Sequence, residues 1–468
     1  MRSSDARGRQ TTLNWVYPPE VAVKPQGTAG GPSAPPAQDG DQSYGEPGTD
    51  LMERVAATDN MWAALRRVEK NKGAAGVDGL KIADLRPYLR LKWPGIREQL
   101  LGGSYKPSPV RRVEIPKPDG GVRLLGVPTL LDRLIQQAML QVLQPIFDPA
   151  FSDSSYGFRP GRKAHDAVGR AKRYVEEGLE WVVDTDLEKF FDRVNHDMLM
   201  ARVARKAKDK RVLRLIRRYL EAGVMVDGVV MGTEEGTPQG GPLSPLLANI
   251  LLDDLDKELE SRGHRFVRYA DDCNIYVRTE KAGHRVMESV TTFLEKRLKL
   301  KVNREKSAVD RPSKRKFLGF RLFKHRDQVR IGLAPKTLKR VKARIRELTT
   351  RGSRNMARRI EKLNTYLRGW LGYFSLADTL SVFEGLDGWT RHRLQACLWK
   401  QWKRTHTRVR ELRALGVPDW LARRIGGSRR GAWYSSGSLM NSALGAAYWQ
   451  VQGLISLSST YRELRQPC

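Results

Sequence analysis

The chain has few cysteines and no long apolar segment. Its three cysteines, Cys273, Cys397 and Cys468, are too few and too far apart for a disulfide framework or a four-cysteine zinc site. No uninterrupted apolar run reaches the roughly 18 residues that a spanning helix needs. No apolar signal core follows Met1 and Arg2. We therefore expect a soluble, intracellular protein that has no membrane partner and no structural zinc.

Acidic residues are also scarce relative to basic ones. The 468 residues include 52 Asp and Glu against 84 Lys and Arg, a formal net charge of +32. Such an excess attracts polyanions, nucleic acid first. Residues 331–430 alone hold 24 basic and 7 acidic residues together with five tryptophans. We expect most of these tryptophans to lie in the core beneath a solvated basic face, whereas the charge excess as a whole favours a polyanion partner.

The N-terminal segment has a different composition. Residues 24–50 contain 11 Gly or Pro among 27 positions, and Tyr44 is their only large apolar side chain. Such a segment cannot bury enough apolar surface to offset the entropy of ordering. We expect residues 1–50 to form a disordered tail. Because this tail carries a net charge of −2, it is not the part that binds nucleic acid.

Residues from about 110 to 325 are expected to be mixed α/β. Thr129, with Asp132 three residues on, marks the start of a helix. Residues 180–186 are typical of a short strand, and residues 265–278 of two strands joined by a tight turn. The pair Asp227-Gly228 between valines indicates a further hairpin. Two later helices are indicated by apolar stripes at Leu338, Val341, Ile345 and Leu348 and at Met356, Ile360, Leu363, Leu367 and Phe374.

Two groups of aspartates lie next to the expected strands. Alternation along a strand places Asp184 and Asp186 on one face, and Asp271 and Asp272 lie at the turn between two apolar strands. Carboxylates beside hydrophobic strands are costly to bury unless a cation compensates, and a divalent metal does so. If the strands are neighbours, Asp186, Asp271 and Asp272 face one point and form a set of oxygen ligands that suits Mg²⁺.

Two magnesium ions about 3.5 to 4 Å apart would support in-line phosphoryl transfer, one activating a hydroxyl and the other neutralising the leaving group. The alternative for any Asp-Asp pair is a solvated turn. We assign that alternative to Asp253-Asp254, whereas the hydrophobic flanks of Asp271-Asp272 favour a metal site.

Tyr-Ala-Asp-Asp at 269–272 is similar to the central motif of reverse transcriptases, and its specificity comes from the ordered motifs around it. These motifs are NKGAAGVDG at 71–79, IPKPDGGVR at 115–123, YGFRPG at 156–161, DLEKFFD at 186–192, TPQGGPLSP at 237–245 and FLGF at 317–320. Over about residues 55–325 the series resembles the fingers and palm of bacterial group II intron-encoded proteins. The resemblance implies an α/β (α+β) right-hand polymerase fold.

The resemblance continues toward the C-terminus. LNTYLRGWLGYF at 363–374 resembles the start of the family's all-α thumb, or maturase domain, and residues 431–457 resemble its small DNA-binding segment. Many members add a His-Asn-His endonuclease, but the paired cysteines of that domain do not follow here, so no target-strand nicking is expected. The expected divisions are a disordered tail at 1–50, fingers and palm at 51–325, thumb at 326–410 and a DNA-binding segment at 411–468.

Carried over position by position, the resemblance makes Asp186, Asp271 and Asp272 the catalytic metal ligands. The backbone carbonyl of Leu187 completes this expected metal site. Asp184 falls outside the family's catalytic position and is expected to support the site instead.

The same resemblance implies contacts to the incoming dNTP. Lys117 and Arg123 match positions that hold the triphosphate, which suits two charged donors on a hairpin. Phe191 matches the steric gate that excludes a ribose 2′-hydroxyl, and Gln239 matches the residue that contacts the nucleotide sugar. Without the resemblance, Lys117 and Arg123 would be ordinary exposed cations and Phe191 a packing residue.

Two further residues are expected near the nucleic acid. Tyr269 is expected near the primer end. Lys306 is a candidate for a phosphate contact, with a solvated surface lysine as the alternative.

The resemblance therefore implies an RNA-directed DNA polymerase that extends a primer on an RNA template with dNTPs and two Mg²⁺ ions. It also implies binding of group II intron RNA and a DNA target, for splicing and retrohoming in the bacterial cytoplasm, at the nucleoid when bound to DNA. A homodimer is left open. One alternative is a non-catalytic RNA-binding splicing factor with a relic polymerase fold, against which the complete aspartate set and the Gln239 motif argue. The other is a reverse transcriptase that serves DNA repair or defence outside an intron.

Overall fold

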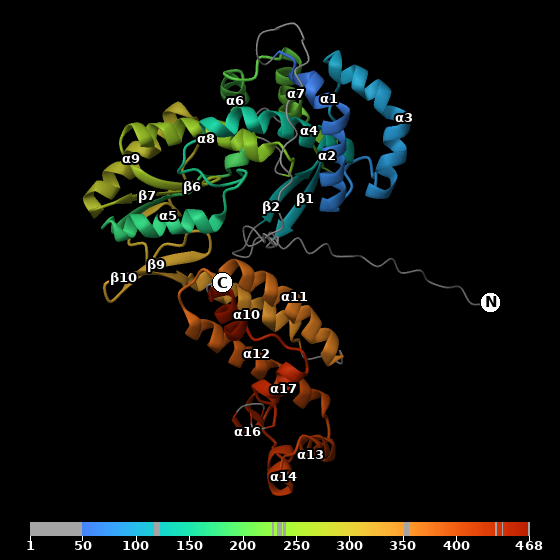
Figure 1. Cartoon of the computed structure of the whole chain (residues 1–468), viewed down its shortest axis with the longest axis vertical. Coiled ribbons are helices and arrows are strands. Elements are labelled where there is room, and N and C mark those ends of the chain that lie inside the picture. Colours follow the sequence, from blue (N-terminus) through green and yellow to red (C-terminus); the bar gives the residue numbers. More distant parts are fainter. Residues whose placement is uncertain are drawn as a thin grey trace, which may run out of the picture. The chain divides into compact units, whose positions relative to one another are not determined.

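The computed structural model describes residues 49–116, 122–226, 229–231, 236, 240–350, 355–435, 438–441 and 443–466. These residues fall into two compact units that meet in the sequence between Arg315 and Lys316 (Figure 1). Nearly all of the expected tail, residues 1–50, lies outside the described residues, and the division of the chain into four domains stays a prediction. None of the described helices is both long and apolar enough to cross a membrane.

The first unit contains helices and strands in mixed order. Its helices are α1 (Leu51–Ala56), α2 (Thr58–Asn71), α3 (Ile82–Leu101), α4 (Leu130–Phe147), α5 (Ala164–Glu176), α6 (His196–Val203), α7 (Lys210–Glu221), α8 (Ser244–Ser261) and α9 (Glu280–Arg297), with the short 3-10 helices η1 (Asp148–Ala150) and η2 (Phe190–Asp192). Its strands are β1 (Val110–Pro116), β2 (Val122–Val127), β3 (Trp181–Thr185), β4 (Val224–Val226), β5 (Val229–Met231), β6 (Arg265–Tyr269), β7 (Asp272–Val277) and β8 (Ala308–Asp310).

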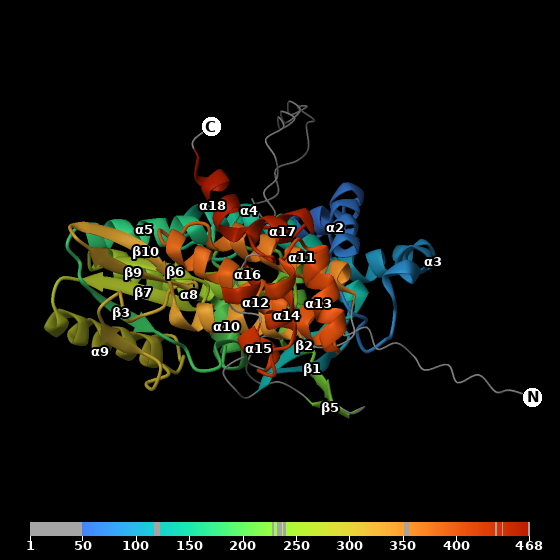
Figure 2. The same ribbon diagram turned by 90° about the horizontal axis from the view of Figure 1, so that it is seen from below.

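The central sheet of this unit has the strand order β6-β7-β3-β8, and all neighbours are antiparallel. Figure 2 labels three of these strands, β6, β7 and β3. Helix α9 packs on one face so closely that a Cβ atom at Gly283 would lie 2.4 Å from Val309 Cγ1. The opposite face carries Tyr276, whose ring centroid is 5.7 Å from that of Tyr174 in α5. The sheet therefore lies between α9 and α5, as Figure 1 shows.

A second sheet has the order β2-β1-β4-β5. Strands β1 and β2 form an antiparallel hairpin, β4 runs parallel to β1, and β5 turns back antiparallel to β4. The hairpin expected around Asp227-Gly228 is confirmed by the pairing of Val226 with Val229, and the turn itself lies outside the described residues.

Local sequence signals account for several element ends. The Thr129 side chain accepts a hydrogen bond from the Asp132 backbone N–H at 3.1 Å, which caps α4 as expected. In α7 the buried side chains are Val212, Leu215, Ile216, Tyr219 and Leu220, spaced as one apolar stripe of a helix. The expected strand at 180–186 is confirmed as β3, and the two strands expected at 265–278 are β6 and β7.

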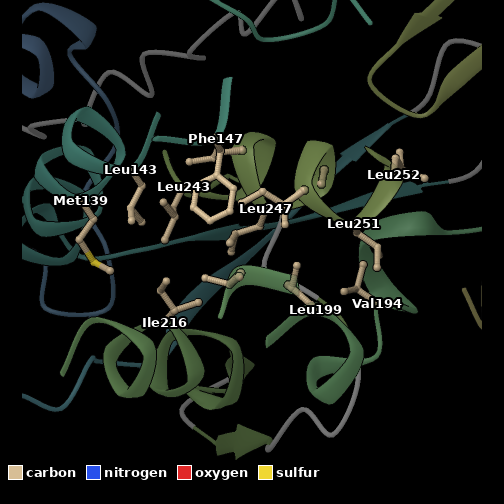
Figure 3. Close-up of a cluster of buried hydrophobic side chains, with 14 of the residues drawn as sticks. Met139, Leu143, Phe147, Val194, Leu199, Ile216, Leu243, Leu247, Leu251 and Leu252 are labelled. Carbon is tan, nitrogen blue, oxygen red and sulfur yellow. The ribbon is translucent and has the colours of Figure 1, made fainter. Parts of the chain in front are cut away.

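A continuous apolar core joins the helices of the first unit to the central sheet. Figure 3 shows a part of it in which side chains of α4, α6, α7 and α8 meet, including Met139, Phe147, Leu199, Ile216 and Leu247. Such burial of apolar surface is the main stabilising contribution to the unit.

The expectation of a solvated turn at Asp253-Asp254 is wrong. Both residues lie inside helix α8, and Asp253 is buried. Asp253 pairs with Lys257, while Asp254 accepts hydrogen bonds from Arg202 and Arg205. Leucines at helical spacing on both sides of the pair keep the segment helical.

The second unit begins with a β-hairpin and is otherwise helical. Its elements are β9 (Phe320–His325), β10 (Gln328–Leu333), α10 (Pro335–Leu348), α11 (Met356–Phe374), α12 (Leu380–Gln401), α13 (Thr405–Ala414), α14 (Asp419–Gly426), α15 (Ala432–Ser435), α16 (Ser438–Asn441), α17 (Ala446–Val451) and α18 (Leu457–Arg465). The two helices expected from the apolar stripes are confirmed as α10 and α11.

Buried contacts tie the end of the chain to this helical unit. Asp387 in α12 accepts hydrogen bonds from the backbone N–H groups of Leu457 at 2.8 Å and Ser458 at 2.9 Å, at the start of α18. The tryptophans do not all belong to the core: Trp370 and Trp399 are buried, whereas Trp420 is exposed.

Candidate active site

The pairing of β3 with β7 brings the distant aspartates to one end of the central sheet. Thr185, the last residue of β3, lies opposite Cys273, so continuing the register by one residue places Asp186 opposite Asp272. Asp271 lies in the two-residue turn between β6 and β7, since Tyr269 pairs with Asp272. Three carboxylates from two parts of the chain thus lie at the same end of the sheet, and each of them is half-buried.

Two backbone hydrogen bonds hold the segment that follows β3. The Asn303 N–H donates to the Asp186 carbonyl at 2.8 Å, and the Glu188 N–H donates to the Lys301 carbonyl at 2.8 Å. Between them Leu187 forms an antiparallel bridge with Val302. Leu187 and Val302 are therefore a non-hydrogen-bonded pair, in which the N–H and C=O of each residue point away from the other. The Leu187 carbonyl therefore points away from Val302, toward the side of β3 on which β7 lies.

Cationic side chains lie beside Asp184 in β3 and Asp186 just after it. Lys306 Nζ is 3.7 Å from Asp186 Oδ2. The Arg315 guanidinium donates to Asp184 Oδ2 at 2.9 and 2.6 Å and to the Lys306 carbonyl at 2.6 Å. Asp184 is thus engaged by an arginine, and this ion pair also fixes the loop that carries Lys306.

The donor chemistry of the aspartate edge suits magnesium, which prefers oxygen ligands and keeps several waters. Asp186, Asp271, Asp272 and the Leu187 carbonyl offer oxygen only. Among the residues that the structure describes, no three His, Cys, Asp or Glu side chains are grouped so as to hold a metal ion. The backbone register brings the expected ligands to the same end of the sheet, while their side chains are not grouped as a metal site.

The turn that carries Asp271 has an unusual backbone. Its first central residue, Ala270, has a φ of 57°, in the left-handed region that residues with a Cβ atom rarely adopt. Gly157 of the YGFRPG motif lies against it, because a Cβ atom there would be 2.3 Å from the Ala270 nitrogen. Only glycine permits this approach without a shift of the turn.

Phe191 lies in η2, a few residues beyond Asp186. Its ring is partly buried against the core and stands edge-on to Phe190, with ring centroids 5.1 Å apart. Gly236 packs on the backbone at this point, since a Cβ atom there would lie 2.9 Å from the Phe191 carbonyl oxygen. Gly236, which precedes the TPQGG motif in the sequence, therefore lies beside the expected steric gate.

The other end of the same segment packs near the β1–β2 hairpin. A Cβ atom at Gly240 would lie 2.6 Å from the Gly126 carbonyl oxygen in β2. Arg123 belongs to β2 and pairs with Ile115, but its side chain lies outside the described residues. Lys117 and Gln239 lie outside them altogether.

Tyr269 precedes the turn at the end of β6, next to an exposed aromatic residue that sequence reasoning missed. Its ring centroid is 6.2 Å from that of Phe158, which is 53% exposed although Tyr156, Gly157 and Arg159 beside it are buried. Phe158 also has a φ of 57°. The apolar type of this residue gave no sign that it would face solvent.

Sequence reasoning also missed the residues that support the turn from behind. Arg268 in β6 is fully buried and binds Asp256 and Asn249 of α8. The sequence did contain a signal for this pair. Arg268 lies inside the apolar run Phe266-Val267-Arg268-Tyr269, and Asp256 lies inside an apolar helix, so each needs a buried partner of opposite charge.

Cys273, next to Asp272, takes no part in thiolate chemistry near neutral pH. Burial raises the pKa of its thiol far above the ordinary value. The neutral thiol is one more packing group on the face of β7 opposite the aspartates.

Two family models match the chain. The model described as "Reverse transcriptase (RNA-dependent DNA polymerase)" matches residues 115–322, and "Group II intron, maturase-specific domain" matches residues 338–416. The first range contains every candidate active-site residue discussed above.

Curated relatives are also similar to this chain. Protein YkfC of Escherichia coli strain K12 is 34% identical over 319 residues, which cover 59% of this chain and 84% of YkfC. The group II intron-encoded protein LtrA of Lactococcus lactis is 30% identical over 338 residues, 58% of this chain and 56% of LtrA. The chain therefore spans little more than half the length of LtrA.

Solved structures with a matching region include a Cas6-RT-Cas1–Cas2 complex, which is 28% identical and covers 52% of this chain and 42% of that chain, with a TM-score of 0.35. Telomerase of Candida albicans is 14% identical and covers 67% of this chain and 63% of that chain, with a TM-score of 0.38.

The fold and the matched models define a reverse transcriptase, an RNA-directed DNA polymerase. The expected fold class, an α/β fingers and palm followed by a helical part, is confirmed. The chain belongs to the group II intron-encoded reverse transcriptase and maturase family.

Proposed function

We propose that this chain joins dNTPs to a primer 3′-hydroxyl on an RNA template, at the aspartate end of the palm sheet and with two Mg²⁺ ions. The β3–β7 register carries this proposal, because it brings Asp186 opposite Asp272 and next to Asp271. Two such ions, held by these oxygen ligands, would supply activation of the attacking hydroxyl and neutralisation of the leaving pyrophosphate. The aspartates then act as ligands and not as general bases.

The residues around this edge would divide the remaining work. Asp186, Asp271, Asp272 and the Leu187 carbonyl would hold the ions. Lys306, now 3.7 Å from Asp186, would contact a substrate phosphate once that carboxylate binds metal.

Selection of the nucleotide would depend on the residues packed around the TPQGG segment. The Phe191 ring would clash with a ribose 2′-hydroxyl and favour dNTPs. Gln239 would contact the sugar, while Lys117 and Arg123 would hold the triphosphate. The packing of Gly236 on Phe191 and of Gly240 on β2 supports this grouping. Tyr269 would lie near the primer end.

We also infer that the chain binds group II intron RNA and a DNA target, and so assists splicing and retrohoming in the bacterial cytoplasm. The match of residues 338–416 to the maturase model supports this role, as does the basic excess of residues 331–430. Recognition of folded RNA relies on phosphate and 2′-hydroxyl contacts, for which a basic surface is suited.

The test is primer extension by the full chain on an RNA template, with and without Mg²⁺. Asp271→Asn should abolish synthesis while binding of intron RNA survives, because the variant loses a metal ligand but no basic surface. Asp197→Asn is the matched control, since Asp197 is an exposed aspartate of α6 paired with Arg217. It should keep both activities.

Other outcomes would favour other functions. If the folded wild-type protein gives no product above background, the relic splicing factor is the better reading. If Asp271→Asn loses synthesis and RNA binding together while still folded, the two roles are not separable. If the DNA that flanks the coding region encodes no folded intron RNA, a role in DNA repair or defence is favoured.

A further inference from the structure

A buried charge lies directly behind the aspartate turn. The side chains of Arg268 and Asp256 are both 0% exposed. Because opposite residues of neighbouring strands share a face, Arg268 faces the same side as Cys273, and the aspartates at 186 and 272 face the other. The arginine therefore lies on the back of the sheet and does not touch substrate.

The guanidinium of Arg268 uses its donors in three directions. Nε and one terminal nitrogen donate to the two oxygens of Asp256 at 2.7 and 2.5 Å. The other terminal nitrogen donates to Asn249 Oδ1 at 2.9 Å and to the Ala270 carbonyl at 2.9 Å. One planar group thus connects helix α8 with the backbone of the turn that carries Asp271.

The same cluster also fixes the YGFRPG loop against the turn. Asn249 Nδ2 donates to the Gly157 carbonyl at 2.8 Å. The backbone of Arg268 donates to the Ser154 carbonyl and accepts from the Tyr156 N–H, both at 2.9 Å. These hydrogen bonds hold Gly157 in close contact with the backbone nitrogen of Ala270. The turn is therefore held by the Arg268 side chain and by the YGFRPG loop.

The turn needs such support because its backbone is unfavourable. Ala270 adopts the left-handed conformation without being glycine, and a residue in that state persists only where its surroundings determine it. A loosened turn would shift Asp271 and Asp272 together. In phosphoryl transfer a misplacement of about 1 Å is enough to slow the reaction by orders of magnitude.

We propose that Arg268, anchored by Asp256 and Asn249, is a positioning residue that sets the geometry of the metal-binding aspartate turn. The inference rests on the proposed Mg²⁺-dependent polymerisation at Asp271 and Asp272. It adds that the buried ion pair serves catalysis through the turn and is not only a contribution to stability.

Arg268→Lys is the first test. Lysine keeps the positive charge beside Asp256, but its single nitrogen cannot reach the carboxylate, Asn249 and the Ala270 carbonyl together. We expect kcat for primer extension to fall at least tenfold. The Mg²⁺ concentration for half-maximal activity should rise several-fold, while the Kd for primer–template stays within twofold.

Arg202→Lys is the matched control. Arg202 donates to Asp254, two residues from Asp256 on the same helix, at 2.8 Å, and has no contact with the turn. We expect it to lower the melting temperature without changing kcat or the Mg²⁺ dependence. If Arg268→Lys and Arg202→Lys lose stability equally and keep the same kcat and Mg²⁺ dependence, the proposal is overturned.

Asn249→Ala provides a second test that leaves the ion pair intact, and it decides the question if Arg268→Lys does not fold. It removes the link to Gly157 and one partner of Arg268, so the Mg²⁺ dependence should again shift. A folded Asn249→Ala protein with wild-type kcat and Mg²⁺ dependence would contradict the proposal. Wild-type protein without Mg²⁺-dependent synthesis would instead contradict the proposed function, so the two failures are distinguishable.

Discussion

The contact between Gly157 and Ala270 shows how little room the aspartate turn has. The left-handed conformation costs a residue with a Cβ atom about 1–2 kcal/mol. At Ala270 the hydrogen bond from Arg268 behind the turn helps to offset this strain. Gly157 lies so close that one added methyl group must move the turn. A residue distant in sequence thus controls where two expected metal ligands lie.

Gly157→Ala should therefore damage both stability and activity. Forcing a Cβ atom to within 2.3 Å of the Ala270 nitrogen is overpacking, for which we expect a loss of about 1–3 kcal/mol in the free energy of unfolding. Primer extension should fall at least tenfold, because Asp271 shifts with the turn. Urea denaturation and single-nucleotide extension measure the two effects.

Gly169→Ala is the control for this substitution. Gly169 lies inside helix α5, and nothing lies within 4 Å of an added Cβ atom. We expect a gain of about 0.5–1 kcal/mol in stability, since alanine is a better helix former, and unchanged activity. Equal behaviour of the two alanine variants would show that the close approach at Gly157 is not important.

At the residue scale, the sequence indicates candidate metal ligands more readily than the residues that support the turn they lie on. Asp186, Asp271 and Asp272 could be found because each adjoins an apolar strand within a known order of motifs. Arg268 and its partner Asn249 could not be paired, because their contact depends on how α8 crosses the back of the sheet. Such a crossing is a tertiary property that no local pattern contains.

At the scale of elements, single side chains join helices that are far apart in the chain. Asp209 caps α7 by accepting from the Arg211 N–H at 2.9 Å, and it also accepts from the Met52 N–H of α1 at 2.9 Å. Burial by itself would raise the pKa of Asp209. The hydrogen bonds from the Arg211 side chain and from these two backbone groups outweigh burial and lower this pKa.

Asp209→Asn should lower the stability of the first unit in a pH-dependent way. Loss of the charged cap should cost about 1–2 kcal/mol at pH 7. Because the folded pKa lies below the unfolded value of about 3.9, the stabilisation is complete above that value and is lost as the pH falls through the folded pKa. Urea denaturation at pH 7 and between pH 4 and 3 measures this. A difference between variant and wild type that stays constant down to pH 3 would contradict the linkage.

Helices and strands are predicted well from the sequence where two local features agree, such as a capping residue and an apolar stripe. Thr129 and Asp132 mark the start of α4, and the apolar stripe beyond them continues the helix. The prediction of a turn at Asp253-Asp254 is wrong because the leucines around the pair have helical spacing. Helical periodicity over a whole element outweighs the turn preference of one dipeptide.

At the scale of the whole molecule, the two units differ sharply in net charge. Residues 316–468 contain 31 basic and 9 acidic residues, a net charge of +22, so most of the total of +32 belongs to the second unit. In α10 the exposed cations Lys342 and Arg346 flank Trp389, 5.9 and 5.3 Å from its ring centroid. Exposed cations of this kind are suited to contact the phosphates of nucleic acid.

Binding of RNA by the full chain should therefore weaken steeply as salt rises. Each neutralised phosphate contributes about −0.7 to the log–log slope on single strands and about −0.9 on duplex DNA. The double variant Lys342→Gln, Arg346→Gln should make the slope shallower by about 1.4, because we expect both exposed cations to contact phosphate. The control removes the same charge from Lys172 and Lys257, which are paired with acids on α5 and α8, and should leave the slope unchanged. Fluorescence anisotropy across a salt series measures both, and a wild-type affinity that is indifferent to salt would remove the electrostatic account of the second unit.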